Sequence, residues 1–214
     1  MDPYRVRIRG PFACFTRPEF KTERLTYEVL TPSAARGILE AILWKPAIRW
    51  QVRTISLLAP IRFIQFKRNE VTNRVSVVNA LRALQNFAPV DYFADDDRAQ
   101  RNTIALRDVD YAVEAEFHMT SRRGPEDNPK KFDDMFRRRL EKGQFHMQPY
   151  LGCREFPAIV QAYEGDPKPL ADLTRDLGYM LHDLRFSPKG NEPVFFRARL
   201  ERGVINVPNW QVAA

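Results

Sequence analysis

Two adjacent lysines, Lys130 and Lys131, stand where the sequence predicts the start of a helix. Asn128 is a typical N-cap, Pro129 suits the first helical position, and Gly143 suits the end of the helix. The helix dipole disfavours cations at this end, at a cost of about 0.3–1 kcal/mol for each exposed lysine. A bound phosphate would turn this cost into a stabilising interaction, because the phosphate would contact two ammonium groups and free backbone N–H donors together. The pattern favours a phosphate site, and lysines that extend into water are the alternative.

A histidine follows the same predicted helix. His146 lies in the short segment 144–148 and could transfer a proton, whereas a loop histidine without a chemical role is the alternative. The run Asp95–Asp97 predicts a solvated loop and not a metal site, because adjacent carboxylates point in different directions. Cys14 and Cys153 are the two cysteines and form no CxxC pair. We therefore predict no metal and no cofactor.

Positive charge is spread over the predicted strands. The chain carries 34 Lys and Arg against 27 Asp and Glu, with a formal charge of +7, which favours polyanionic partners. Residues 4–9 alternate strictly, so their arginines share the face opposite to Tyr4, Val6 and Ile8, and residues 48–53 alternate in the same way. The candidate contacts to a phosphate backbone are Arg7, Arg9, Arg49 and Arg53. A solvated sheet surface is the alternative.

Aromatic and cationic side chains are interleaved after the first strand. Phe15 could stack on a nucleobase beside Arg17, or it could anchor the loop on the core. The outer face of the strand predicted at Val109–Met119 is acidic, and His118 on that face is expected to be exposed or salt-bridged.

Helix and strand patterns follow one another in a recognisable order. Thr31–Pro32 begins a first helix that Lys45–Pro46 stops, and Asn128 begins a second. Strands are predicted at Tyr4–Arg9, Ile48–Arg53, Ile61–Phe66, Val109–Met119 and Glu155–Tyr163, and a strand of an excursion from the core is predicted at Val75–Val78. The order strand, helix, strand, strand, helix, strand is that of a ferredoxin-like (RRM-like) βαββαβ unit, so we predict an α+β fold with this unit in residues 1–163.

The remaining segment, residues 164–214, predicts a small C-terminal antiparallel β-sheet. Gly165–Pro169 is typical of a linker. Beyond it we expect a strand at Tyr179–Phe186 and a hairpin of Val194–Leu200 with Val204–Val207.

Several classes of function have no support in these 214 residues. No apolar run approaches the ~18 residues of a membrane span, and the N-terminal residues do not resemble a signal peptide, so a cytoplasmic protein without a membrane partner is expected. Neither a phosphate-binding GxxxxGK[ST] loop nor a GxSxG elbow is present, which removes support for nucleotide hydrolysis and esterase chemistry.

Six blocks of sequence carry a resemblance to a known family. They are Gly10–Pro18, Thr22–Tyr27, Thr31–Ala35, Gly37–Pro46, Arg107–Ala115 and Leu151–Glu155. Together they resemble the type I-C CRISPR-associated endoribonuclease of the RAMP superfamily. The resemblance implies metal-independent cutting of CRISPR repeat RNA and retention of the 5′ handle. It also implies assembly with the backbone and large subunits of the type I-C interference complex, and it makes Arg154 in the last block a further RNA-binding candidate.

The catalytic set of related enzymes is matched only in part. The resemblance implies a Tyr at the end of the first helix and a Lys-His pair at the start of the second; the Lys matches Lys130, but the Tyr position falls on Leu43 and the His position on Lys131. Lys131 could serve as general base only in its neutral form, and His146 could replace the missing imidazole.

Three hypotheses therefore remain open. The first is metal-independent cleavage of repeat RNA, with Lys130, Lys131 and His146 at the scissile phosphate. The second is a non-catalytic subunit that binds the RNA handle. The third, from a different class, is a metal-dependent DNA nuclease or duplex DNA binder.

Overall fold

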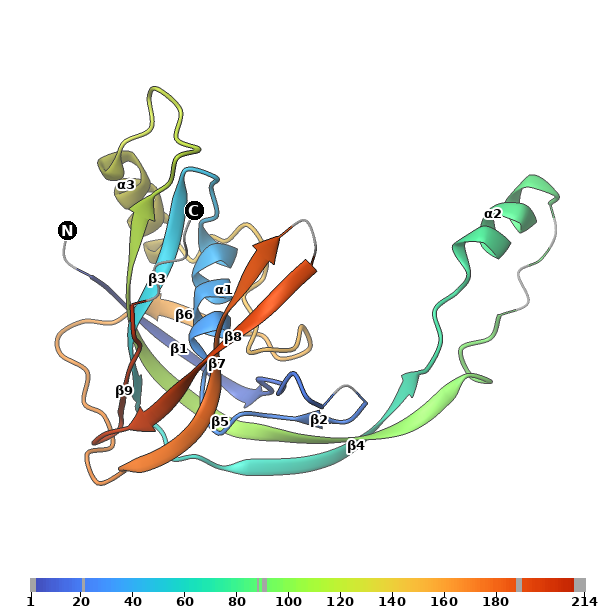
Figure 1. Cartoon of the computed structure of the whole chain (residues 1–214), viewed down its shortest axis with the longest axis horizontal. Helices are drawn as coiled ribbons and strands as arrows, with labels where there is room; N and C mark the ends of the chain where they lie inside the picture. Colours follow the sequence, from blue (N-terminus) through green and yellow to red (C-terminus); the bar gives the residue numbers. More distant parts are fainter. Residues whose placement is uncertain (1–2, 21, 88, 90–91, 188–189, 210–214) are drawn as a thin grey trace.

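The main sheet forms the body of the molecule. The computed structural model describes residues 3–20, 22–87, 89, 92–187 and 190–209. Its main sheet has the strand order β6 (Ile159–Ala162), β1 (Tyr4–Ala13), β5 (Arg98–Met119), β3 (Ile48–Leu57) and β9 (Val204–Asn206), in which neighbours run antiparallel (Figure 1). The short β2 (Arg24–Leu25) pairs parallel with β5. The chain is therefore a mostly-sheet α+β protein.

Two helices, α1 (Pro32–Ile42) and α3 (Pro129–Glu141), pack against this sheet and against each other. The ring of Phe136 on α3 lies 4.8 Å from Tyr4 of β1 and 4.5 Å from Trp50 of β3, measured between centroids. Both N-caps are confirmed: the Thr31 hydroxyl accepts from the Ala34 N–H, and the Asn128 side chain accepts from the Lys131 N–H. Because side chains alternate along a strand, the residues next to Tyr4 on β1 and next to Trp50 on β3 face away from α3.

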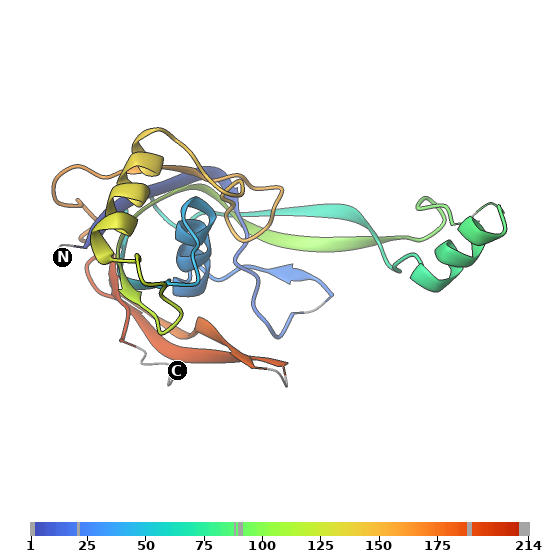
Figure 2. The ribbon, with the colours of Figure 1, turned by 90° about the horizontal axis from the view of Figure 1, so that it is seen from above.

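A long two-stranded arm extends from the body. β4 (Phe63–Val71) pairs with the first half of β5, from Phe63 opposite Leu106 to Val71 opposite Arg98. The arm carries α2 (Val77–Gln85) toward its far end, well away from the main sheet (Figures 1 and 2). The predicted strand Ile61–Phe66 therefore belongs to the arm, and β5 takes its place in the centre of the sheet.

The strand predicted at Val75–Val78 is wrong, because α2 begins there. Ser76 is the N-cap of α2, and its hydroxyl accepts from the Asn79 N–H. β-branched residues such as Val77 and Val78 favour strands only weakly. In this segment the cap and the amphipathic pattern that follows it dominate.

The C-terminal segment contributes to both sheets. β7 (Arg175–Ser187) pairs with β8 (Gly190–Leu200) in a separate antiparallel sheet. The predicted hairpin of Val194–Leu200 with Val204–Val207 is wrong, since β9 crosses to the edge of β3, with Thr54 opposite Asn206. The chain does turn at Gly203, where φ is +77°. The strand predicted at Glu155–Tyr163 is shorter than expected and is β6.

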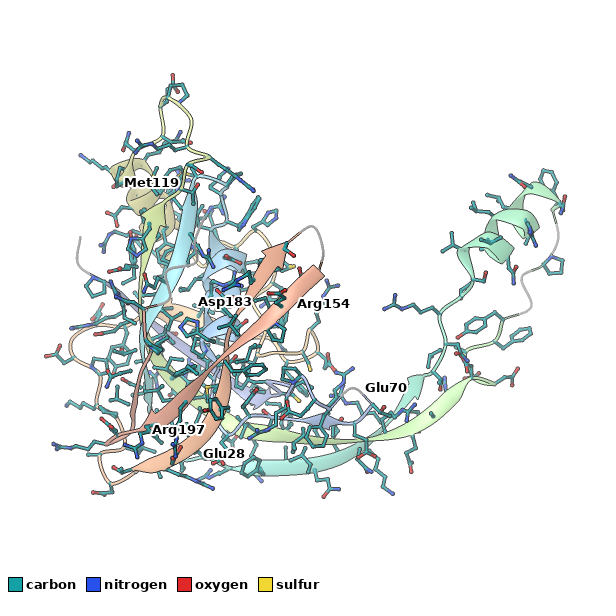
Figure 3. All side chains as sticks on the ribbon, viewed as in Figure 1. Glu28, Glu70, Met119, Arg154, Asp183 and Arg197 are labelled. Carbon is teal, nitrogen blue, oxygen red and sulfur yellow. The ribbon has the colours of Figure 1, made fainter. Side chains whose placement is uncertain are left out.

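A buried ion-pair network joins α1 to the β7–β8 sheet, which lies on the other side of α1 from the main sheet (Figure 2). The Arg36 guanidinium donates to Asp183 at 2.8 and 3.1 Å and to Glu40 at 2.6 Å. Asp183, labelled on β7 in Figure 3, is 7% exposed, and Arg49 is its second cation at 3.5 Å. The network therefore neutralises the charge of a buried carboxylate.

Replacing Arg36 by Ala is expected to lower the free energy of unfolding by about 3 kcal/mol, because loss of one partner leaves a buried charge poorly compensated. The value lies at the lower end of the range for such pairs because Arg49 remains beside Asp183. Urea denaturation measures it. The matched control is Arg98→Ala, which breaks an exposed pair with Asp95 and should cost less than about 1 kcal/mol. Equal losses for the two variants would contradict this role of Arg36.

Among the described residues, no helix combines the length and the apolar character that crossing a membrane requires.

Candidate functional site

A cationic pocket lies at the start of α3. It has a volume of about 310 Å³ and is lined by Lys45, Pro46, Ala47, Arg122, Asp127, Lys131, Phe132 and Met135. The register of the sheet creates it: Ile48 at the start of β3 pairs with Met119 at the end of β5, so the turn before β3 meets the loop after β5. Thr120 holds the two segments together, since its hydroxyl donates to the Pro46 carbonyl and its N–H to the Ala47 carbonyl.

Asp127 orients Lys131 in this cationic pocket. The Lys131 ammonium lies 3.0 Å from one Asp127 oxygen, and the Gly124 N–H donates to the other at 2.9 Å. The Gly124 N–H, then Lys131, lower the pKa of Asp127. Asp127 is thus a carboxylate at neutral pH, and its contact with the Lys131 amine orients that side chain. With Lys45 and Arg122, the cationic pocket contains three cations and one carboxylate.

The two predicted lysines do not behave alike. Both lysines are exposed, but only Lys131 lines the cationic pocket, and Lys130 makes no ion pair within the described part of the chain. Successive helical residues point about 100° apart, so the neighbours project differently. Only Lys131 is held in a defined position.

The predicted His146 lies at the other end of α3. The backbone N–H of His146 donates to the Ala41 carbonyl at 2.7 Å. The Arg139 side chain donates to the neighbouring Ile42 carbonyl. α3 has 13 residues, which at 1.5 Å per residue is a length of about 20 Å. The structure therefore does not bring His146 together with Lys130 and Lys131.

Most of the predicted sheet arginines are paired. Arg7 makes two hydrogen bonds to Asp110, at 3.0 and 2.6 Å, and Arg53 pairs with Glu116. Arg49 is 3.5 Å from Asp183, while Arg9 is exposed without an ion pair among the described residues. The acidic outer face of β5 thus neutralises much of the predicted basic surface. His118 is exposed as predicted, with its Nε2 2.9 Å from Glu116.

The loop candidates have separate positions. Phe15 is only 3% exposed and packs in the core, which confirms the anchor role, and its stacking on a base stays a prediction. Arg17 lies over the ring of Tyr27, 4.5 Å from its centroid. Arg154 is exposed in the loop before β6 (Figure 3).

Sequence reasoning missed Lys45 and Arg122. In the sequence Lys45 indicates only the end of a helix, and Arg122 lies in a segment without a pattern. The antiparallel pairing of residues near Ile48 with those near Met119 is the signal that could have joined them. Among the described residues, no three His, Cys, Asp or Glu side chains gather as metal ligands.

The chain belongs to the family described as CRISPR-associated protein (Cas_Cas5), whose Cas5d model matches residues 4–208. It is 49% identical, over 95% of its length and 94% of the relative, to a CRISPR pre-crRNA endoribonuclease Cas5d of Mannheimia succiniciproducens. It is 42% identical, over 97% of its length and 92% of the relative, to the protein of that name of Thermus thermophilus.

Solved structures have the same fold. A CRISPR-associated protein superposes with a TM-score of 0.69 at 22% identity, covering 97% of this chain and 92% of the other. A chain of a CRISPR RNA-guided surveillance complex superposes with a TM-score of 0.52 at 14% identity, covering 95% and 90%.

Proposed function

We propose that this protein binds CRISPR repeat RNA and cleaves precursor crRNA as an endoribonuclease. The observation that carries the proposal is the identity of 49% and 42%, over nearly the whole chain, to proteins named pre-crRNA endoribonucleases. We further propose that it works in the cytoplasm and keeps the 5′ handle of its product. It then joins the backbone and large subunits of a type I-C interference complex.

A ferredoxin-like unit would frame this activity. The strand order β6-β1-β5-β3, with α1 after β1 and α3 after β5, agrees with a βαββαβ unit. We propose that residues 1–163 bind and process the RNA, and that residues 164–214 form a small C-terminal sheet, with β9 completing the edge of the larger one.

The cationic pocket suits the scissile phosphate. In cleavage without a metal, the ribose 2′-oxygen attacks the adjacent phosphorus, the bond to the 5′-oxygen breaks, and the 2′ proton leaves while the 5′-oxygen gains one. Negative charge grows on the phosphoryl oxygens between these events, and nearby cations stabilise it. Lys131, held by Asp127 and supported by Lys45 and Arg122, supplies that charge. In this proposal Lys131 acts as an electrostatic stabiliser of the phosphoryl charge.

The decisive experiment uses the purified chain with its own repeat RNA. Cleavage is expected at one position in EDTA, and a 2′-deoxy substitution at the attacking ribose should abolish it because the nucleophile is missing. Gel analysis of end-labelled RNA measures both outcomes. Cleavage that needs a divalent metal, or a 2′-deoxy substrate that is cut as fast as RNA, would contradict the proposed chemistry.

A second candidate is a handle-binding subunit without cleavage. It is favoured by Leu43, which is fully buried where related enzymes have a Tyr, and offers no hydroxyl. This candidate predicts salt-sensitive binding of repeat RNA without product. One discrete cut by pure protein would exclude it. The DNA hypothesis is tested alongside, by incubating duplex DNA with Mg²⁺ or Mn²⁺.

A further inference from the structure

A second hollow, the α1 groove, runs along the exposed side of α1. Its volume of about 500 Å³ lies within the range of small-ligand pockets. It is lined by Phe15, Thr16, Tyr27, Thr31, Ser33, Ala34, Gly37, Ile38, Glu40, Ala41, Trp44, Met147, Tyr150, Gly152 and Leu181. The helix contributes small residues, and a Cβ added to Gly37 would have no atom within 4 Å. A flat ring could therefore lie close to the helix backbone.

Trp44 stands at the end of this groove and is unusually exposed. Its relative exposure is 55%, whereas Leu43 before it is fully buried and Trp50 on β3 is 2% exposed. An indole left in water beside a concave, aromatic-lined surface is typical of a binding site, since a stacked partner would remove its apolar area from water.

Trp44 and Lys45 connect two hollows. Trp44 lines the α1 groove, and Lys45 lines the cationic pocket together with Lys131. Their Cα atoms are consecutive, about 3.8 Å apart. An apolar, aromatic surface that is joined through consecutive residues to a pocket with three cations matches the two parts of a nucleotide, its base and its backbone. Hydroxyls of Thr16 and Ser33 line the groove and can bond to the edge of a base.

We propose that the α1 groove holds one unpaired nucleobase of the repeat RNA, stacked on Trp44 and adjacent to the phosphate in the cationic pocket. This inference rests on the proposed function, because it assigns a second part of the same RNA. Trp44 is thereby a substrate-positioning residue: it sets which phosphate reaches Lys131 and takes no part in proton transfer.

The test is a double-mutant cycle on binding. Trp44→Ala is expected to raise the Kd for repeat RNA by about 5- to 150-fold, the loss that corresponds to stacking of one base. Trp44→Phe should recover most of it. An abasic nucleotide at the unpaired position next to the cut should weaken wild-type binding equally and should add nothing in Trp44→Ala. The control is Tyr179→Ala, which removes another exposed ring, 71% accessible, outside the groove.

The outcomes separate the two proposals. If the wild-type chain binds and cuts the RNA while Trp44→Ala behaves like Tyr179→Ala, the groove inference is overturned and the proposed function stands. Additive losses from Trp44→Ala and every abasic substitution also overturn it. A wild-type chain that neither binds nor cuts repeat RNA overturns the proposed function and this inference together. Because Trp44 is exposed, thermal unfolding of the variant should match wild type, which excludes misfolding.

Discussion

Replacing Lys131 by Ala is expected to slow cleavage of repeat RNA by about 10²–10³-fold, the usual cost of removing one group that stabilises charge in a transition state. The physical reason is the fixed position of its ammonium, 3.0 Å from Asp127 and inside a pocket with Lys45 and Arg122. Single-turnover cleavage with saturating protein measures the chemical step apart from binding.

Two variants separate charge from other effects. Lys131→Arg should recover part of the rate if the residue supplies charge, whereas a residue acting as general base would show no recovery, since arginine does not lose its proton. Lys142→Ala removes the same charge at the far end of α3 and should cut the RNA at nearly the wild-type rate. If the Lys131→Ala variant cleaved the RNA at the wild-type rate, the cationic pocket would have no role in the reaction.

Gly152→Ala is expected to lower the free energy of unfolding by about 3–5 kcal/mol, and the melting temperature by roughly 10 °C. A Cβ at this position would lie 2.0 Å from the Cys14 carbonyl oxygen, and the backbone φ of +83° disfavours any side chain. The close approach is held by the Cys14 N–H, which donates to the Leu151 carbonyl at 3.0 Å. Moving the two backbone segments apart to make room for the Cβ would break this hydrogen bond. Differential scanning calorimetry measures the change.

Gly165→Ala provides the matched control. Gly165 has a similar φ of +74°, but an added Cβ would meet nothing within 4 Å. Its substitution should cost only the backbone strain, about 1–2 kcal/mol. If the two variants lost equal stability, the steric contact with Cys14 would not be the cause.

The close approach at Gly152 explains a block that sequence alone only matched to a family. In the sequence, residues 151–155 carry a family resemblance but indicate no physical role. In the structure they bring the end of β1 against the loop before β6, and Gly152 also lines the α1 groove. The glycine therefore serves the fold and the shape of the groove together.

Local patterns predicted the body of the protein well. The caps at Thr31 and Asn128 and the alternation of residues 4–9 were correct, because capping and period-2 burial act between residues close in the chain. The same local reasoning failed at Val75–Val78, where strand propensity competed with a helix cap, and at β9, whose partner lies about 150 residues earlier.

For the candidate site residues, too, the sequence predicted the features that depend on neighbours in the chain and not those that depend on distant residues. Sequence alone marked the start of α3 as a place for an anion, from the types of Asn128, Pro129 and the lysines. It could not tell that Asp127 holds Lys131, that the acids of β5 neutralise Arg7 and Arg53, or that His146 lies at the opposite end of the helix.

The sequence by itself thus determined the charge of the protein, the ends of its helices α1 and α3, the alternating faces of its central strands and its family resemblance. The tertiary structure decided which charges remain unpaired and which side chains share a pocket. The physical reason is that periodicity and capping are properties of neighbours along the chain, whereas ion pairs and pockets depend on strand register, which joins residues such as Ile48 and Met119 across long stretches of chain.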